Sequence, residues 1–281
     1  MNKTIRNCLL PTVLIGAWCG CALAASPGTT DHYGGRDLIV YVPPQMPAPG
    51  ARALVVVLHG GLGNAERIAF KRTETGLNMD SVAEKDGFVV AYLDGTPVTR
   101  RMGADKLGWN AGGGCCGLSA EKNIDDVTYI KGAVDYLVGK YSIDRARIFG
   151  MGHSNGAMMV QRLMCESDLF TAGVSISGPL NTRNESCTGA RGKHILGIHG
   201  ADDDNVPIAG GQGSIQMSRA IYNSEERTRQ IYQSAGAVYD LQVIQGAGHK
   251  LAEMDAAIQQ SEHQTIAEKC AKFFGLDKKA T

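Results

Sequence analysis

Residues 147–160 read RIFGMGHSNGAMMV, and this stretch decides which fold the rest of the chain must form. It begins as a short apolar strand ending at Met151, passes through the pentapeptide Gly152-His153-Ser154-Asn155-Gly156, and continues as a helix-like run. A sharp turn from strand to helix needs small residues beside the serine, and it lifts the hydroxyl clear of the sheet edge. The pentapeptide alone is a weak signal in a chain with 36 glycines, because an ordinary glycine-rich turn has the same composition.

Short apolar runs alternate with amphipathic segments along the chain. The apolar runs predict strands at 38–42, 54–58, 88–93, 147–151, 174–176, 195–198 and 241–244. Capping residues and apolar stripes predict helices over 78–85 with Gly87 just past the end, from Asn123, from Asn223, and over 261–274. This alternation predicts an α/β fold with a mainly parallel central sheet and helices on both faces.

The residue types that activate a serine follow three of the predicted strands. Ser154 follows the strand ending at Met151, an Asp-Asp-Asp run at 202–204 follows strand 195–198, and His249 follows strand 241–244. A serine hydroxyl becomes nucleophilic when a base takes its proton and a third group orients that base. The order serine, aspartate, histidine is one of the known chain orders of such triads. Chemistry alone does not separate the three aspartates at this point.

A turn that could stabilise an oxyanion follows another strand. His59-Gly60-Gly61 comes directly after strand 54–58, and backbone N–H groups aimed at a developing negative charge stabilise tetrahedral intermediates. The expected donors are the N–H groups of Gly61 and Asn155. Four features in one compulsory order favour a nucleophilic active site over a glycine-rich turn. His153, beside the serine, either lines the substrate pocket or packs beneath it.

The N-terminus has the pattern of a secretory signal peptide. Two basic residues precede an apolar run over 9–18, and small residues end at Ala24. We expect a signal peptide at 1–24, one catalytic domain over 25–281, and a secreted or periplasmic location. A lipoprotein is less favoured, because bulky Trp18 stands where small residues are expected.

Composition excludes several function classes. Lys plus Arg and Asp plus Glu both number 28, so no basic stripe indicates nucleic acid, and no later apolar run is long enough for membrane insertion. The glycine-rich segments lack the lysine and hydroxyl residue of a phosphate-binding loop. Metal-ligand spacing is absent, so the prediction includes no metal and no cofactor. In an oxidising compartment one or two disulfides and at least one free thiol are expected from the remaining cysteines, which are Cys115, Cys116, Cys165, Cys187 and Cys270.

Several longer motifs resemble one known group of proteins. Together these residues resemble the secreted esterases related to polyhydroxybutyrate depolymerases and feruloyl esterases, which have the α/β-hydrolase fold. The resemblance covers nearly all of the chain after the signal peptide. Its motifs are His59-Gly60-Gly61, Trp109-Asn110-Ala111-Gly112, Cys115-Cys116-Gly117, Asp125-Asp126-Val127, Ser154-Asn155-Gly156-Ala157-Met158-Met159, Arg162-Leu163-Met164-Cys165-Glu166, and His199-Gly200 followed by Val206-Pro207.

The resemblance assigns roles to individual residues. The family pattern selects Asp203 as the acid, and it makes Ser154 the nucleophile and His249 the base. It places Trp109 along the substrate cleft, although a core position is nearly as well supported. It also makes Cys165 and Cys187 the first pair to test for a disulfide, with Cys116 and Cys270 as weaker candidates.

The predicted function is a serine carboxylesterase acting through an acyl-enzyme on a small or oligomeric ester, of the feruloyl, acetyl or short hydroxyalkanoate type. The main alternative is a polyester depolymerase of the polyhydroxybutyrate type, and others are an acyltransferase and a non-catalytic binding protein. Related sequences usually carry an aromatic residue shortly after the base histidine, whereas Lys250 follows His249 here, which predicts a changed acyl or leaving-group pocket. The oligomeric state is not predicted.

Overall fold

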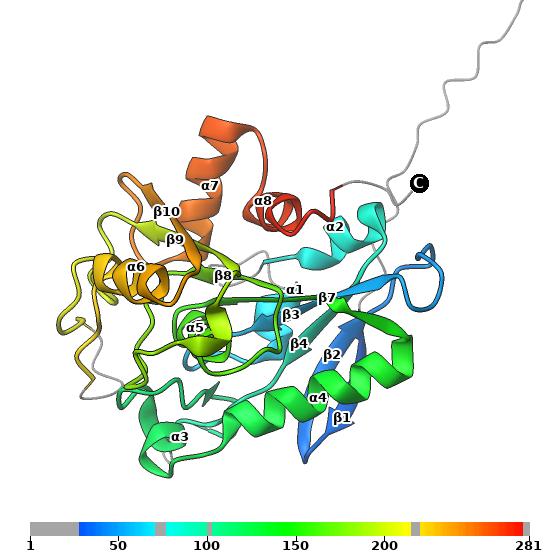
Figure 1. Cartoon of the computed structure of the whole chain (residues 1–281), viewed down its shortest axis with the longest axis horizontal. Coiled ribbons are helices and arrows are strands. Elements are labelled where there is room, and N and C mark those ends of the chain that lie inside the picture. Colours follow the sequence, from blue (N-terminus) through cyan, green and yellow to red (C-terminus); the bar gives the residue numbers. More distant parts are fainter. Residues whose placement is uncertain (1–27, 71–76, 100–102, 215–219, 278–281) are drawn as a thin grey trace, which may run out of the picture.

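An eight-stranded sheet runs through the molecule, with helices on both of its faces (Figure 1). The computed structural model describes residues 28–70, 77–99, 103–214 and 220–277. The strand order is β1-β2-β4-β3-β7-β8-β9-β10, and β2 is antiparallel to both of its neighbours, whereas every other pair is parallel. The predicted α/β fold with a mainly parallel sheet is confirmed. The expected signal peptide at 1–24 lies outside the described residues.

The strands of the large sheet match the predicted apolar runs, with one addition at the edge. They are β1 (Thr29–Tyr33), β2 (Arg36–Tyr41), β3 (Arg52–Leu58), β4 (Val89–Leu93), β7 (Ile143–His153), β8 (Ala172–Ile176), β9 (His194–Gly200) and β10 (Val238–Ile244). Strand β1 has no apolar alternation, because it is a largely exposed edge strand, and the sequence therefore did not predict it. Two short strands, β5 (Thr96–Pro97) and β6 (Leu107–Gly108), form a separate antiparallel pair.

Eight α-helices are found in the described residues. They are α1 (Ala65–Phe70), α2 (Met79–Asp86), α3 (Gly117–Glu121), α4 (Asp126–Tyr141), α5 (Asn155–Glu166), α6 (Glu225–Ser234), α7 (Leu251–Glu262) and α8 (Ile266–Phe273). A single 3₁₀ turn covers Thr188–Ala190. None of the helices in these ranges is long and apolar enough to cross a membrane.

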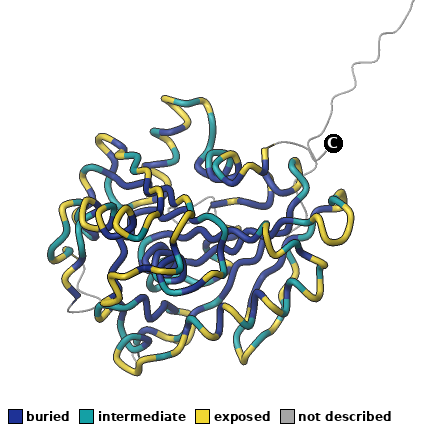
Figure 2. Tube along the Cα trace, viewed as in Figure 1, coloured by how far each residue is buried: buried dark blue, intermediate teal, exposed yellow. Residues whose placement is uncertain are grey.

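The side chains of the central strands divide between two hydrophobic cores. Leu54, Val56 and Leu58 of β3 pack into the core beneath α4, α5 and α6, while Val55 and Val57 pack into the core beneath α1, α2, α7 and α8. Successive side chains of a strand point to opposite faces, so a strand buried on both sides must be apolar at every position. Figure 2 shows this central layer as buried, with the exposed residues concentrated on helices and loops.

Two predicted helix starts are displaced because another residue supplies the cap. Helix α4 is capped by Asp125, whose carboxylate accepts the Thr128 N–H, and not by Asn123. Helix α6 is likewise capped by Ser224 and not by Asn223, whose side-chain amide instead donates to the Leu180 carbonyl. Both true caps use an oxygen side chain to satisfy an N–H group of the first turn.

The prediction of one closing helix over 261–274 is wrong. Helix α7 occupies 251–262 and ends at His263, which has a left-handed conformation with φ of 56°. Helix α8 then starts afresh at Ile266, because Thr265 and Glu268 form a reciprocal capping box. In contrast, the predicted helix end at Gly87 is confirmed, since Gly87 caps α2 with φ of 78°.

The cysteines form two disulfides in the described part of the chain. The predicted bond between Cys165 and Cys187 is confirmed, and it ties α5 to the 3₁₀ turn. The weaker expectation for Cys116 and Cys270 is wrong, because Cys116 pairs with its neighbour Cys115 while Cys270 is a buried free thiol in α8. The side chain of Cys270 is enclosed in the apolar core on the other face of the sheet from Cys116.

Candidate active site

Ser154 occupies the sharp turn between β7 and α5. Its backbone has φ of 55° and ψ of −123°, a conformation that side-chain-bearing residues rarely adopt and that costs about 1–3 kcal/mol. Gly152 and Gly156 make this turn possible, because a Cβ on Gly152 would lie 2.6 Å from the Gly156 backbone, and one on Gly156 would lie 2.2 Å from the Leu58 carbonyl oxygen. The turn presents the Ser154 hydroxyl to an open cavity.

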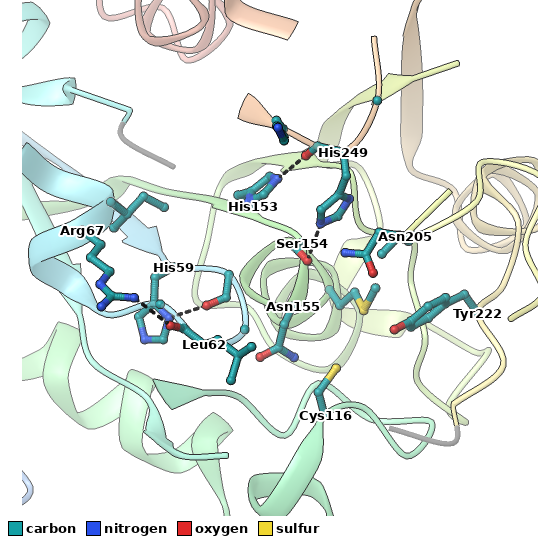
Figure 3. Close-up of a pocket in the computed structure, with 18 of the residues that line it drawn as sticks. His59, Leu62, Arg67, Cys116, His153, Ser154, Asn155, Asn205, Tyr222 and His249 are labelled. Carbon is teal, nitrogen blue, oxygen red and sulfur yellow. Dashed lines mark hydrogen bonds between the residues drawn. The ribbon is translucent and has the colours of Figure 1, made fainter. Parts of the chain in front are cut away.

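His249 lies between Ser154 and Asp203. Its Nε2 is 2.9 Å from the Ser154 Oγ (Figure 3), and its Nδ1 is 2.8 Å from the Asp203 Oδ2. The three residues come from loops at the carboxyl ends of β7, β9 and β10, which are brought together because the parallel strands end at the same edge of the sheet. Hydroxyl, imidazole and carboxylate therefore form one hydrogen-bonded line.

The structure separates the three consecutive aspartates. Asp203 is buried and reaches His249, whereas Asp202 and Asp204 are exposed. The second oxygen of Asp203 accepts the N–H groups of Asn205 at 3.0 Å and Val206 at 2.8 Å. These bonds fold the loop after β9 around the carboxylate, which is how Asp203 is oriented toward His249.

Asp203 is held as a carboxylate. Burial by itself would raise its pKa, but hydrogen bonds from His199 and His249 and from the Val206 N–H hold the pKa well below its usual range. His199 lies behind Asp203, with its Nε2 3.3 Å from the Asp203 Oδ2. Burial of His199 opposes its charged form, yet hydrogen bonds to Asp203 and Glu225 raise its pKa to about 10.

The turn after β3 is fixed by His59. The His59 Nδ1 donates to the Gly60 carbonyl at 2.8 Å and its Nε2 accepts the Gly95 N–H at 3.1 Å, so this imidazole is neutral with a defined tautomer. Burial lowers its pKa to about 4. The turn places Gly61 in the wall of the cavity beside Ser154 and Asn155. Asn155 is the first residue of α5, where a backbone N–H has no partner within the helix.

Trp109 is not a wall of this cavity, so the expectation that it lines the substrate cleft is wrong. Its side chain is fully buried, and the indole N–H donates to the His59 carbonyl at 2.9 Å. The Asn155 side chain bonds the Trp109 backbone twice, accepting its N–H at 2.7 Å and donating to its carbonyl at 3.0 Å. A large aromatic residue beside an active site supports the backbone here without touching the opening.

His153 lines the cavity only with a small exposed part of its ring. Its Nε2 donates to the His249 carbonyl at 2.9 Å, and the two imidazole rings lie 4.9 Å apart. Burial and the neighbouring His249 lower its pKa to about 3, so this ring is neutral. His153 therefore borders the cavity and also packs beneath the site, where it holds the His249 backbone.

The cavity beside Ser154 has a volume of about 550 Å³ and extends to both sides of the serine (Figure 3). Leu62 and Arg67 lie on one side, and Asn205 and Tyr222 lie on the other. No local pattern in the sequence predicts most of these walls, because they come from loops and helices that are far apart in the chain. Apolar walls are formed by Leu62, Ile68, Cys116, Met158, Val206 and Tyr222, and polar positions by Asn64, Arg67, Asp204, Asn205, Lys250 and Glu253.

Lys250 lies in the wall of this cavity, at the N-terminus of α7. Glu253 in the first turn of that helix accepts the Gly248 N–H at 3.0 Å, which ties α7 to the loop that carries His249. Lys250, which stands where an aromatic residue was expected, and the nearby Glu253 therefore place charged groups in the wall of the pocket. No group of three or more metal-ligating side chains occurs in the described ranges.

The chain is similar in sequence to proteins that are named as esterases. It is 31% identical over 177 residues to NocK of Nocardia uniformis subsp. tsuyamanensis, which is named as an esterase, covering 62% of this chain and 47% of the relative. It is 29% identical over 181 residues to feruloyl esterase B of Neurospora crassa, covering 60% and 55%. The matches span about half the length of these relatives.

A solved carboxylesterase from Bacillus cereus shares the fold. It superimposes with a TM-score of 0.57 at 15% identity, covering 87% of this chain and 96% of that structure. The family model described as phospholipase/carboxylesterase matches residues 45–253, which is about three quarters of the chain and includes Ser154, Asp203 and His249. The chain therefore belongs to the phospholipase/carboxylesterase family of α/β-hydrolases.

Proposed function

We propose that this protein is a serine carboxylesterase that acts through an acyl-enzyme. The observation that carries the proposal is the hydrogen-bonded line from the Ser154 hydroxyl through His249 to the buried Asp203 carboxylate, at the mouth of a cavity with apolar walls. A serine is activated in this way when an imidazole takes its proton and a carboxylate fixes the tautomer of that imidazole. Membership in a family of ester hydrolases supports the same chemistry.

Each step follows from the hydrogen-bond directions. The Ser154 Oγ attacks the ester carbonyl carbon as its proton passes to the His249 Nε2, while the Nδ1–H stays bonded to Asp203. The carbon–oxygen bond to the alcohol then breaks, and the alcohol leaves with the proton from Nε2. Water next gives a proton to Nε2 and attacks the acyl carbon. The bond from the acyl carbon to the Ser154 Oγ then breaks, and Nε2 returns its proton to that oxygen, which releases the acid and restores Ser154.

The carbonyl oxygen becomes negative in both tetrahedral intermediates. The N–H groups of Gly61 and Asn155 are the proposed donors to this oxygen, because both residues line the cavity beside Ser154. Each preorganised donor of this kind stabilises the transition state by about 2.7–4 kcal/mol. His59 and Trp109 support the Gly61 turn from behind, and the Asn155 side chain links that support to α5.

The proposed substrate is a small or oligomeric ester with an uncharged acyl group next to the scissile bond. The apolar walls around Ser154 favour such a group, and a feruloyl esterase is among the relatives in sequence. Feruloyl, acetyl and short hydroxyalkanoate esters all fit this description. A panel of p-nitrophenyl esters, methyl ferulate, acetylated xylan and hydroxybutyrate oligomers distinguishes them, and a high-molecular-weight polyester film tests the depolymerase alternative.

Replacing Ser154 tests the mechanism. We expect Ser154→Ala to lower kcat on p-nitrophenyl acetate by about 10³-fold or more, with the thermal melt unchanged. Ser261→Ala is the matched control, because Ser261 is an exposed serine in α7 whose hydroxyl bonds only its own helix. The wild type should label with a fluorophosphonate probe and Ser154→Ala should not. Near-wild-type hydrolysis by Ser154→Ala would overturn the proposal, and product partition toward an added alcohol would indicate an acyltransferase.

We also infer from the sequence pattern that residues 1–24 are a signal peptide and that the protein is exported. Intact mass spectrometry of protein recovered from the periplasm or medium of an expressing bacterium tests this inference. The expected mass corresponds to a chain starting at Ala25 or Ser26. Recovery of only the full-length chain from the cytoplasm would contradict it.

A further inference from the structure

A second set of buried polar residues lies behind Asp203, on the side away from Ser154. His199 of β9 donates from its Nδ1 to a carboxylate oxygen of Glu225 at 2.7 Å, and the other oxygen of Glu225 accepts the Tyr239 hydroxyl. Glu225 begins α6 and is 2% exposed, and His199 is fully buried. The polar line that starts at Ser154 therefore continues past Asp203 into the core.

Both ring nitrogens of His199 face acceptors. Its Nε2 is 2.8 Å from the Val206 carbonyl and 3.3 Å from the Asp203 Oδ2, and its Nδ1 faces Glu225. A neutral imidazole has only one N–H, so it would leave one of these acceptors facing a lone pair. An imidazolium at His199 satisfies both sides at once, because it donates from Nδ1 to the Glu225 carboxylate and from Nε2 toward Val206 and Asp203.

The charges of this set balance in a particular way. The positive charge of His199 and the negative charge of Glu225 cancel, so one net negative charge remains at Asp203 to face His249. Other groups around the set add no formal charge, since His153 of β7 is neutral and the phenols of Tyr232 and Tyr239 and the amide of Gln161 are un-ionised. Without Glu225, the same imidazolium would neutralise Asp203.

We propose that His199 and Glu225 are positioning residues of the reaction that act through Asp203. His199 holds the Asp203 oxygen that bonds His249, and Glu225 cancels the charge that His199 brings. The proposal rests on the proposed function, because His249 must become an imidazolium during catalysis and needs the net negative charge of Asp203 to stabilise it. A purely structural pair that joins α6 to β9 would not affect the basicity of His249.

Charge removal and charge compensation distinguish these two roles. In Glu225→Gln the His199 imidazolium neutralises Asp203, so we expect the acidic limb of the kcat/KM profile to move about one pH unit lower. The value of kcat should fall about 10-fold while KM stays within about two-fold. In His199→Gln/Glu225→Gln both charges are absent and the amide introduced at position 199 can still donate, so the limb and most of kcat should return toward wild type.

Glu226→Gln is the matched control, because Glu226 follows Glu225 in the same helix but is exposed and bonds Arg229. Its profile should equal that of the wild type. A Glu225→Gln limb within about 0.2 pH units of the wild type, or a double variant no more active than Glu225→Gln, overturns the proposal.

A measurement on the wild type keeps the proposal testable where a buried variant does not fold. In ¹⁵N-histidine-labelled protein, the His199 ring, assigned by its contacts with Val206, should keep both nitrogens protonated from about pH 6 to about pH 9. A neutral ring at pH 7 overturns the charge argument. Failure of the proposed function is recognised separately, since Ser154→Ala would then leave hydrolysis intact whatever the Glu225 variants do.

Discussion

The molecule contains two His-Gly turns of the same kind, and they have opposite electrostatic character. His59-Gly60 follows β3 and His199-Gly200 forms the end of β9, and both imidazoles are buried at the same edge of the sheet. His59 is neutral with a pKa lowered to about 4, whereas His199 is charged with a pKa raised to about 10. Equal burial therefore accompanies opposite charge states.

The hydrogen-bond partners explain the difference. His59 meets one donor and one acceptor, the Gly95 N–H and the Gly60 carbonyl, so the neutral ring satisfies both. His199 meets only acceptors, of which Asp203 and Glu225 are carboxylates, and these outweigh the cost of burying a charge. The first turn is thus a neutral support for the proposed oxyanion donors, and the second contributes to the charge that we propose orients the base.

The largest expected effect on catalysis comes from changing Asp203, which contacts the charged His199. Asp203→Asn should lower kcat by about 10⁴-fold, because an amide in this position favours the wrong tautomer of His249. The fold should persist, since the loop N–H groups of Asn205 and Val206 retain an oxygen acceptor. Steady-state kinetics on p-nitrophenyl acetate check the loss, and Asp202→Asn is the control because that neighbouring side chain is exposed and lies outside the cavity wall. An equal loss in Asp202→Asn would refute the assignment of the acid.

The next largest effect is on stability, and it comes from changing Gly156, which packs against the turn that carries the neutral His59. Gly156→Ala would place a Cβ 2.2 Å from the Leu58 carbonyl and 2.5 Å from the His59 carbonyl, so α5 and the His59-Gly60-Gly61 turn must separate. We expect a loss of about 3 kcal/mol in the free energy of unfolding. Gly139→Ala in α4 is the matched control, because nothing lies within 4 Å of its Cβ and alanine favours helix. Urea unfolding of both variants measures the difference, and equal midpoints would show that the close packing is not essential.

The smallest expected effect is on the pH dependence of stability, which has opposite signs at His59 and His199. The folded-state pKa of His59 lies below the ordinary value of 6.5, so the unfolded state takes up the proton first and stability falls as the pH drops from 6.5 toward 4. His199 has the opposite sign, and its contribution is complete below pH 6.5 and is lost as the pH rises through about 10.

Removing the imidazole of His59 tests the acidic half of this contrast. Between about pH 6 and about pH 5 the free energy of unfolding of the wild type should decrease, because unfolded His59 takes up a proton and folded His59 does not. The glutamine in His59→Gln takes up no proton in either state, so the decrease should be smaller by about 1 kcal/mol in this variant. Denaturant unfolding at several pH values gives both slopes. Parallel slopes would mean that His59 is not held neutral in the folded protein.

Much of the architecture follows from local patterns in the sequence. The continuous apolar run of β3 predicts a strand buried on both faces, and the glycines around Ser154 predict the sharp turn, because both are local steric requirements. Helix ends were less predictable: at α4, Asn123 and Asp125 are both good capping residues by type. Only the path of the backbone shows that Asp125 reaches the Thr128 N–H.

The sequence by itself determined the class of fold, the order of serine, aspartate and histidine, and the glycines that the turn requires, because these depend on periodicity and on contacts between neighbours in the chain. The tertiary structure alone decided that Trp109 supports the His59-Gly60-Gly61 turn from the core and that Glu225 pairs with His199. Glu225 lies 26 positions after His199 and on a different element. Charge and burial at such a site are set by partners that only packing brings together.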